Sequence, residues 1–445
     1  MKVLGRWSLA SFMKLVVDVC YFTLLVVLPL VGVLLLLLAI TGGREGHVTI
    51  HVPVRFHLDP ESHPFTTSRG DIQSVAITNA QGTLELRGGA ASVGYVWAGL
   101  GVGIIILAVT LFILSRLRGL FRTLKEQNPF VPQNSRRIRS IGVALILGDV
   151  VTAGFATWLA TRVSSAVSVA GVMVDTSFTV DFVPIGAGVI LIMLAEVFRI
   201  GAQMKGDLET ARKIQFDLVP GEHFEKRDVV VQARMQTARS VGGDYYDVFD
   251  LDEGHLGVLV GDVAGKGLPA ALMMTAIVGS VRALLTAGVR GGKLVEALNR
   301  HVWAHTPEGR FVTLFYGELD VVTGALTYVN AGHNPPFLVR ADGSMERLEP
   351  TAMVLGVKPD APVETGQTRI GPADRLLLFT DGLSEAFNAR EEEYGETRLA
   401  GALGRSRTLP PPAAIESLTA DVYSFCAGIA LRDDMTLMLV ARQPA

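Results

Sequence analysis

Six aspartates in the C-terminal half lie beside glycines or at the ends of apolar runs. They are Asp244 and Asp247 in "VGGDYYD", Asp262 in "GDVAGKG", Asp381 in "LLLFTDG", and Asp433 and Asp434 in "LRDDMTLMLV". Carboxylate oxygens suit hard cations such as Mg²⁺ or Mn²⁺, and two such ions close together can activate a water and clamp a phosphoryl group. Aspartate is also a common turn residue. The set as a whole, rather than any one member, therefore predicts a metal-dependent hydrolytic site.

The segment "GDVAGKG" follows an apolar run and precedes a helical-looking run, where a phosphate-binding loop could lie. A P-loop requires G-x-x-x-x-G-K-[ST]. Counting back from Gly265 and Lys266 puts Val260 at the first position, and Gly267 stands where a hydroxyl residue is needed. Asp262 would also repel a phosphate at that place. We therefore interpret Asp262 as an acid at a strand end, and we exclude a nucleotide cradle.

The N-terminal half has the composition of a membrane domain. The chain of 445 residues is 49% hydrophobic, with a mean hydropathy of +0.38. Apolar runs long enough to cross a bilayer occupy 15–40, 94–114, 141–161 and 182–200. The first run is longer than a signal-peptide core and no convincing cleavage site follows it, which favours an anchor. A net charge of −3 gives no reason to expect nucleic acid as a partner, and two cysteines are too few for a disulfide framework.

Basic residues set the expected orientation of the four spans. Between the second and third spans the cations outnumber the acids seven to one; they are Arg116, Arg118, Arg122, Lys125, Arg136, Arg137 and Arg139, against Glu126. The positive-inside rule places this loop and both termini in the cytoplasm. We expect a multi-pass protein of a bacterial inner membrane. Asp18 and Asp149 lie inside spans, where an acid is either functional or a paired residue near a helix end.

The outside loop, 41–93, is expected to form a small extracytoplasmic β-structure. "HVTIHVPVRFHL" alternates apolar and polar residues as a half-buried strand does, and a hairpin is expected around Asn79–Gly82. His47, His51 and His57 share one face of that strand and could bind a metal or sense pH. An ordinary solvated face is the favoured interpretation.

The connecting segment 206–221 is expected to be helical. Apolar residues recur at three or four positions, from Met204 through Leu208, Ala211 and Ile214 to Leu218. A helix of this kind can form a dimeric signalling coil, which would make the protein a homodimer, or it can pack on its own domain. Both interpretations stay open.

Residues 222–445 are expected to form an antiparallel α+β domain, because most short β-rich runs follow one another without an intervening helix. The runs are "DVVVQARMQ", "HLGVLVGD", "FVTLFYGELD", "LTYVNAG", "PPFLVR", "RLLLFTDG" and "MTLMLVAR". "LPAALMMTAIVGSVRALL" and "KLVEALNRHVWAH" have helical patterns.

These segments together resemble the SpoIIE-type branch of the metal-dependent (PPM) protein serine/threonine phosphatases over about 208–442. "SVGGDYYDVFDLD", "VGDVAGKGLPAALMM", "DRLLLFTDGLSEAFN" and "RDDMTLMLVAR" carry the resemblance. It implies an αββα sandwich, a binuclear Mn²⁺ or Mg²⁺ site between the two sheets, and hydrolysis of phosphoserine or phosphothreonine on a partner protein. Residues 1–205 resemble a family of bacterial four-span membrane domains of unclear function.

The resemblance also assigns roles to single residues. It implies that Asp262 bridges the two metals, that the carbonyl of Val263 binds the second, and that Asp381 and Asp433 bind the first. Asp244 resembles a direct ligand or a holder of metal-bound waters. Catalysis would use the metal-activated water held by Asp262 and Asp381; Asp247 and Asp434 rank lower as ligands.

Ala264 departs from the eukaryotic relatives, which have a histidine there that is suggested to be a general acid. His333 in "NAGHNPP" is a candidate replacement by its chemistry. Fixing a turn by hydrogen bonds is the favoured alternative for this histidine.

The expected function is therefore a membrane-anchored, signal-regulated protein phosphatase. The resemblance implies a phosphorylated STAS-domain anti-sigma-factor antagonist as the class of partner. The alternative is a catalytically weak receptor or binding module of the same fold. A diguanylate cyclase is excluded, because "GGDYY" has tyrosines, Tyr245 and Tyr246, where GGDEF has an acid and Phe.

Overall fold

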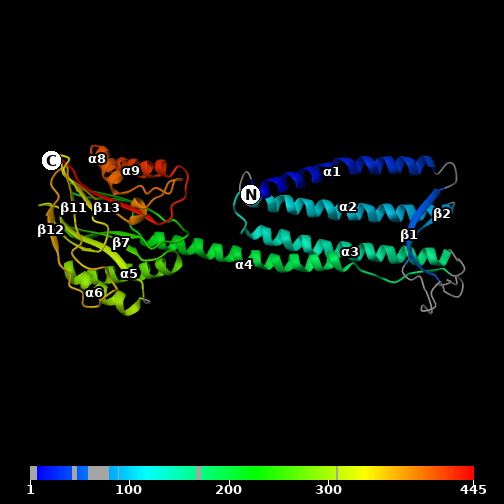
Figure 1. Ribbon diagram of the computed structural model, residues 1–445, viewed down its shortest axis with the longest axis horizontal. Coiled ribbons are helices and arrows are strands. Elements are labelled where there is room, and N and C mark those ends of the chain that lie inside the picture. Colours follow the sequence, from blue (N-terminus) through cyan, green and yellow to red (C-terminus); the bar gives the residue numbers. More distant parts are fainter. Residues whose placement is uncertain are drawn as a thin grey trace, which may run out of the picture. The chain divides into compact units, whose positions relative to one another are not determined.

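The computed structural model describes residues 8–42, 48–58, 80–88, 90–166, 172–306 and 309–444. The chain divides into two compact units, Met1–Gly206 and Asp207–Ala445 (Figure 1). The first unit holds long helices and a small sheet. The second holds two larger sheets and the remaining helices.

Four long helices dominate the first unit. They are α1 (Leu9–Gly42), α2 (Ala90–Lys125), α3 (Pro132–Ala166) and α4 (Phe182–Leu218), the last of which continues into the second unit. Each is long and apolar enough to cross a membrane by length and composition. Helix α5 (Leu268–Thr286) also meets this criterion, but six of its apolar residues are buried in the second unit. Glycines bring α3 and α4 close together, since a Cβ on Gly142 would lie 2.5 Å from the carbonyl oxygen of Gly188.

The basic segment between the second and third predicted spans is mostly helical, because α2 and α3 extend beyond those spans. Only the residues from Glu126 to Val131 connect α2 to α3. Lysine and arginine are good helix formers, and Pro132 opens α3 at the first helical position, where its missing N–H costs nothing. The connection is fixed by Asn134, whose Nδ2 donates to Thr123 Oγ1 at 2.7 Å and to the Pro129 carbonyl at 2.9 Å.

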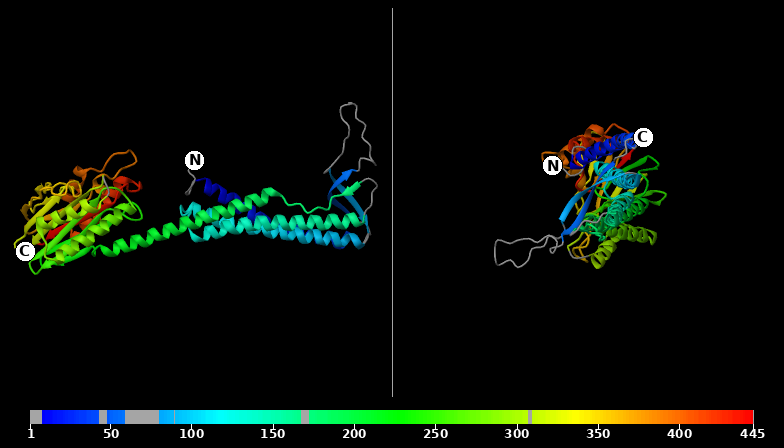
Figure 2. Two further views of the ribbon diagram at one scale, coloured as in Figure 1. Left: turned by 90° about the horizontal axis from the view of Figure 1, so that it is seen from below. Right: turned by 90° about the vertical axis from the view of Figure 1, so that its right-hand side faces the viewer.

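The small sheet of the first unit has the strand order β2–β1–β3, all antiparallel, with β1 (Val48–Leu58), β2 (Ala80–Gly88) and β3 (Val172–Val174). It lies at the end of the bundle where α1 ends and α2 begins (Figures 1 and 2). The predicted strand is confirmed as β1. The predicted turn is wrong at Gly82, which pairs with Val54 inside β2, because the ladder with β1 satisfies its backbone groups. Asn79 and His47 lie outside the described residues.

Both acids of the predicted spans have partners. Asp18 contacts Lys14 Nζ at 2.7 Å and Arg118 Nε at 2.6 Å. Asp149 accepts a hydrogen bond from the Asp181 N–H at 3.1 Å. These contacts agree with the paired alternative for both acids.

The second unit contains two antiparallel sheets. One has the order β11–β10–β13–β14–β5–β4 and the other β12–β9–β8–β7–β6. The strands are β4 (His223–Lys226), β5 (Val229–Gln236), β6 (Tyr245–Asp252), β7 (His255–Val263), β8 (Val312–Asp320), β9 (Ala325–Ala331), β10 (Phe337–Val339), β11 (Met345–Arg347), β12 (Gly366–Arg369), β13 (Arg375–Phe379) and β14 (Met435–Arg442). The helices are α5, α6 (Gly291–His305), α7 (Asp381–Ser384), α8 (Glu396–Ser406) and α9 (Pro411–Cys426).

Three hydrophobic cores show how the layers stack. Along β7, Val258 and Val260 belong to a core shared by the two sheets, whereas Leu259 belongs to a core shared with α5 and α6. Along β14, Met438 faces the first core and Leu437 a third, shared with α8 and α9. This alternation follows from the two-residue period of a strand. The unit is therefore a four-layer arrangement of helices, sheet, sheet and helices.

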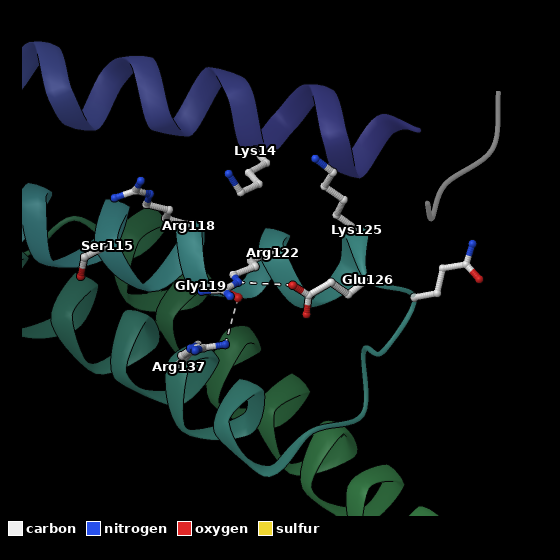
Figure 3. A pocket seen from close by; sticks show the side chains of 9 residues that line it. Lys14, Ser115, Arg118, Gly119, Arg122, Lys125, Glu126 and Arg137 are labelled. Atoms are coloured by element: carbon white, nitrogen blue, oxygen red, sulfur yellow. Dashed lines mark hydrogen bonds and ion pairs between the residues drawn. The ribbon is translucent and has the colours of Figure 1, made fainter. Parts of the chain in front are cut away.

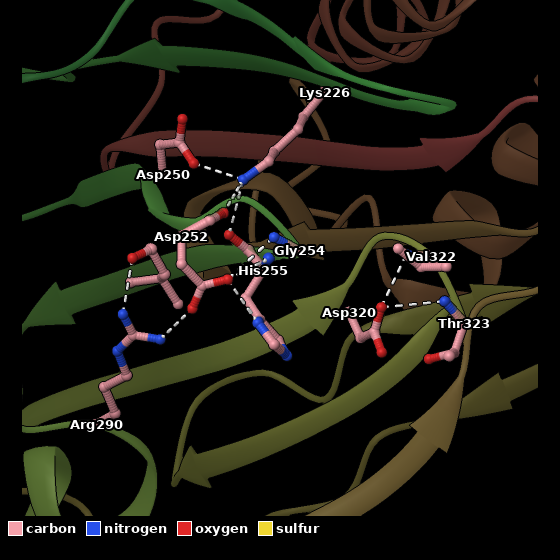
Figure 4. A network of polar contacts seen from close by, with 10 residues as sticks. Lys226, Asp250, Asp252, Gly254, His255, Arg290, Asp320, Val322 and Thr323 are labelled. Carbon is pink, nitrogen blue, oxygen red and sulfur yellow. Dashed lines mark hydrogen bonds and ion pairs between the residues drawn. The ribbon is translucent and has the colours of Figure 1, made fainter.

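A polar network closes the β6–β7 turn (Figure 4). Asp252 accepts hydrogen bonds from the backbone N–H of His255 at 3.0 Å and from Arg290 Nη1 at 2.8 Å. The hydrogen bond from Arg290 and the His255 contact hold the pKa of Asp252 well below its usual range. Lys226 adds an ion pair to Asp250 at 2.5 Å. These contacts fix the register of the hairpin that carries Asp262 at its other end.

Candidate metal centre

Asp262 is the second-to-last residue of β7, where the strand leaves the two-sheet core. Burial, and then the negative charges of Asp381 and Asp433, raise the pKa of Asp262 to about 7. Gly243 lies against it: a Cβ there would be 2.9 Å from the Val263 carbonyl oxygen and 3.3 Å from Asp262 Oδ1. The absence of a side chain at Gly243 therefore lets the loop before β6 approach both predicted ligand positions.

Asp244 lies in that loop with 1% of its surface exposed. Its Oδ2 accepts hydrogen bonds from Thr380 Oγ1 at 2.8 Å and Thr436 Oγ1 at 2.7 Å. Burial and the charge of Asp262 raise the pKa of Asp244 well above its usual value. The two hydroxyls fix the orientation of the carboxylate, and Thr380 adjoins Asp381, so they also tie three segments of the site together.

Asp381 is the first residue of α7, in the connection that follows β13. Asp433 lies in the connection that precedes β14. Burial, and then the charge of Asp433, raise the pKa of Asp381. The two connections pass very close to each other: a Cβ on Gly382 would lie 1.9 Å from the Asp434 carbonyl oxygen. Only glycine at position 382 permits this approach.

Asp434 has a structural role in the site. Its Oδ1 accepts the Ala238 N–H at 2.8 Å and its Oδ2 accepts the Gly243 N–H at 2.7 Å. These bonds anchor the glycine loop and occupy both carboxylate oxygens. Asp434 is therefore better described as the support for the Asp244 loop than as a ligand.

Asp247 is not brought together with the other acids. It is buried beside α5, where it accepts hydrogen bonds from Tyr245 Oη and from Arg282 Nε, the latter at 3.1 Å. Burial raises the pKa of Asp247. The side chain links β6 to α5.

The turn after Asp262 joins the site to α5. Gly265 and Gly267 have φ values of 106° and 75°, which disfavour residues with a Cβ. Lys266 between them donates to the Arg432 carbonyl at 2.8 Å and forms an ion pair with Asp433. Within the described residues no three His, Cys, Asp or Glu side chains lie close enough to hold one ion, and Lys266 is the cation that contacts Asp433.

The chemistry of this donor set fits divalent cations. Asp244, Asp262 and Asp381 come from three different strand ends. The negative charge of Asp262 raises the pKa of Asp244, and the negative charge of Asp381 raises the pKa of Asp262. A bound cation would offset this repulsion. Carboxylates with few other donors suit Mg²⁺ or Mn²⁺.

His333 is 1% exposed, in the turn after β9. Its Nδ1 lies 3.0 Å from Thr313 Oγ1, and its backbone N–H donates to Asn330 Oδ1 at 2.8 Å. Burial lowers the pKa of His333 to about 4. The ring is therefore neutral at pH 7, which does not favour the general-acid role and agrees with the turn-fixing alternative.

The buried imidazole predicts a pH dependence of stability. A histidine with a pKa of 6.5 in the unfolded chain and about 4 in the folded one destabilises the fold as the pH falls from 6.5 to 4, because only the unfolded chain takes up the proton. We expect the unfolding free energy of the metal-free fragment 207–445 to fall by about 3 kcal/mol over that range relative to His333→Gln. Chemical denaturation of both proteins at each pH measures this difference. If the unfolding free energies of the two proteins change with pH in parallel, the pKa of His333 is the same in the folded and unfolded chains, which would contradict this prediction.

Several residues that hold the site were not identified from the sequence. Thr380 and Thr436 orient Asp244, Lys266 pairs with Asp433, and Gln215 of α4 holds the glycine loop. Arg310 has a buried Nη1 without a hydrogen-bond partner among the described residues and lies near Gly265. Of these residues, only Thr380 could have been noticed in the sequence, because it directly precedes Asp381.

Residues 252–443 match the family model described as stage II sporulation protein E (SpoIIE). These residues are similar to that family, and we call the unit that contains them the SpoIIE-family domain. Residues 89–211 match a second model, described as a protein of unknown function (DUF2975).

Curated proteins that are similar to this chain include two bacterial relatives. The phosphoserine phosphatase RsbU of Bacillus subtilis is 29% identical over 184 residues, 41% of this chain and 55% of that protein. The protein IcfG of a Synechocystis strain is 27% identical over 263 residues, 53% of this chain and 41% of that protein. The chain thus spans about half the length of the curated relatives it matches.

Among solved structures, the SiaA-PP2C domain of Pseudomonas aeruginosa has a TM-score of 0.47 at 20% identity, over 54% of this chain and 97% of that one. The RsbU and RsbW domains of a Mycobacterium tuberculosis protein have a TM-score of 0.42 at 29% identity. That match covers 49% of this chain and 61% of the other. The SpoIIE-family match includes Asp262, Asp381 and Asp433 but begins after Asp244.

Proposed function

We propose that the SpoIIE-family domain is a protein serine/threonine phosphatase that uses two Mn²⁺ or Mg²⁺ ions. The observation that carries the proposal is the convergence of the buried Asp244 and the partly buried Asp262 and Asp381 at the ends of strands from both sheets. Carboxylates crowded in this way need a cation to be ionised together. The similarity to RsbU, a phosphoserine phosphatase of Bacillus subtilis, supports the choice of substrate class.

The chain's residues would act as follows. Asp262 would hold both ions, with the Val263 carbonyl beside it, and Asp381 and Asp433 would complete the set. Asp244, fixed by Thr380 and Thr436, would orient a water in the site. When bound, the ions would lower the pKa of that water and neutralise charge on the phosphoryl oxygens.

Proton delivery to the leaving serine oxygen falls to water rather than to His333. The imidazole is buried and neutral at pH 7. Ala264, the position after Val263, has no group that can donate a proton from its side chain. We therefore expect no step of the reaction to depend on His333 beyond its contribution to stability.

The substrate class can be tested with the full chain in detergent. We expect Mn²⁺-dependent release of phosphate from phosphoserine and phosphothreonine peptides, loss of release on chelation, and much slower release from a matched phosphotyrosine peptide. Release that is independent of metal would overturn the mechanism. Metal binding without hydrolysis of any of the three peptides would favour the binding-module alternative.

We further propose that residues 1–205 are a four-span membrane domain joined by residues 206–221 to the phosphatase domain, residues 222–445. Both termini would face the bacterial cytoplasm, and a sensed signal would act through α4. Two contacts near the end of α4 support such coupling. Gln215 Nε2 donates to the Gly242 carbonyl at 2.7 Å, next to Gly243 and Asp244, and Arg282 of α5 donates to the Leu218 carbonyl at 2.8 Å.

The topology makes a direct prediction. A cysteine-accessibility reporter at Gly70 should be labelled from outside the cell, and one at Asn128 only after the membrane is permeabilised. Positive charge on the ends of α2 and α3 favours this orientation. Labelling of both positions from the same side would contradict it.

As for partners, we propose a phosphorylated STAS-domain anti-sigma-factor antagonist as the substrate class and a homodimer through the linker helix. Met204 and Ile214 support the dimer, since about 60% and 59% of their surfaces are exposed on α4. Comparing the phosphoproteomes of cells with wild-type protein and with Asp381→Ala would identify the substrate. If no STAS-domain protein accumulates phosphoserine in the Asp381→Ala cells, this substrate class is rejected.

A further inference from the structure

A cavity of about 1110 Å³ lies in the first unit, near the start of α1, the end of α2 and the start of α3. Figure 3 shows Lys14 pointing from α1 into the space that Arg118 and Lys125 of α2 enter from the opposite side. The lining residues are Lys14, Ser115, Arg118, Gly119, Arg122, Lys125, Glu126, Gln127 and Arg137. Five of them are cationic and one is acidic, so the cavity has a strong positive potential.

The walls of the cavity are held by contacts that leave it open. Arg137 Nη1 donates to the Gly119 carbonyl at 2.9 Å and to Asn134 Oδ1 at 2.9 Å. Gly119 makes this possible, because a Cβ there would lie 2.7 Å from Arg137 Nε. On the other side, Asp18 contacts Lys14 and Arg118 and sets the spacing of α1 and α2. The position of these side chains is therefore fixed without a ligand.

The negative charge present does not neutralise the cavity. Asp18 is shared between Lys14 and Arg118, and Glu126 contacts Arg122 Nε at 3.3 Å. Lys125 makes no ion pair with any described residue, and Arg122 keeps 73% of its side-chain surface exposed. At least two cationic side chains can thus turn toward an anion without breaking the framework.

We propose that this cavity binds a phosphate-bearing anion, as an effector site of the membrane domain. Several guanidinium and ammonium donors around one space are the arrangement that recognises phosphate oxygens. The inference rests on the proposed membrane placement for its preferred source, an anionic lipid headgroup. Phe12 and Leu15, with 59% and 61% of their surfaces exposed, flank Lys14 on α1 and suit acyl chains beside such a headgroup.

The test uses the full chain in a non-ionic detergent and isothermal titration calorimetry with three probes. These are dioctanoyl phosphatidylglycerol, dioctanoyl phosphatidylcholine and glycerol 1-phosphate. We expect the phosphatidylglycerol to bind in preference to the zwitterionic lipid, with an affinity that falls as salt is raised. Arg122→Gln and Lys125→Gln should each weaken binding about fivefold.

Arg116→Gln is the matched control, since Arg116 is on the same helix but does not line the cavity and lies over the Phe112 ring instead. It should change affinity by less than about twofold. Binding of glycerol 1-phosphate with the same loss in Lys125→Gln would identify a soluble anion as the source. Binding of the lipid alone would identify the headgroup.

Equal binding of the two lipids, or equal losses in Lys125→Gln and Arg116→Gln, would overturn the proposal. Phosphate release is measured on the same preparations. A preparation that binds the anion but hydrolyses no phosphopeptide would refute the proposed catalytic function and leave the anion site standing. A preparation that hydrolyses the phosphopeptide but does not bind the anion would refute the anion site and leave the proposed catalytic function standing. Failure of one proposal is therefore distinguishable from failure of the other.

Discussion

Asp262→Asn is expected to lower metal-dependent phosphate release from a phosphoserine peptide by about a thousandfold, because loss of the shared carboxylate removes several kcal/mol of metal-centred stabilisation. The substitution keeps the shape of the side chain and removes a charge that the fold holds at a cost, since burial raises its pKa. The domain should therefore remain folded. Steady-state release by the full chain at saturating Mn²⁺ measures the effect, and circular dichroism checks the fold.

Asp250→Asn is the matched control for this prediction. Asp250 lies on β6, near the opposite end of the same hairpin, with 65% of its side chain exposed. Loss of its surface ion pair with Lys226 should leave the rate within about twofold. Similar rates in Asp262→Asn and Asp250→Asn would remove Asp262 from the centre.

Gly382→Ala is expected to destabilise the SpoIIE-family domain by about 3 kcal/mol and to reduce its activity with it, because the new methyl group overlaps the Asp434 carbonyl oxygen. Relief of that overlap must move Asp381 away from the 433–434 connection. Fragment 207–445 has its own three cores and is expected to unfold as a unit, so urea denaturation can measure the loss.

Gly404→Ala gives the contrasting result with the same chemical change. Gly404 lies in α8, and nothing stands within 4 Å of the position of its Cβ. Alanine there should raise the unfolding free energy by about 0.5–1 kcal/mol, through better helix propensity, and leave the rate unchanged. If the Gly382→Ala domain is as stable as the Gly404→Ala domain, the connection that carries Gly382 has room to move away from Asp434, and the prediction is wrong.

The strands that carry the site could be predicted because their periods are local. Alternating or continuous apolar runs identified β5, β7, β8, β9, β10, β13 and β14, and the two helical patterns identified α5 and α6. Asp262 and Asp381 directly follow such runs, so the sequence placed them at strand ends. The strands β6 and β12, whose apolar periodicity is weak, were not identified.

Contacts between distant segments could not be predicted in this way. Thr436 and Asp244 are 192 positions apart, and no local pattern indicates that a hydroxyl from β14 orients an acid before β6. The prediction of a turn at Gly82 was wrong for a related reason, since pairing with β1 outweighed the local preference for a turn. Asp247 shares a motif with Asp244, but Asp244 precedes β6 whereas Asp247 lies within it and contacts Arg282 of α5.

The measurement that tests the central claim most directly counts bound Mn²⁺ and released phosphate in the same sample of the full chain. We expect that release from a phosphoserine peptide rises with the amount of bound Mn²⁺, stops when the ion is chelated, and stays at background in Asp262→Asn. Undiminished release after chelation, or from Asp262→Asn, would contradict it.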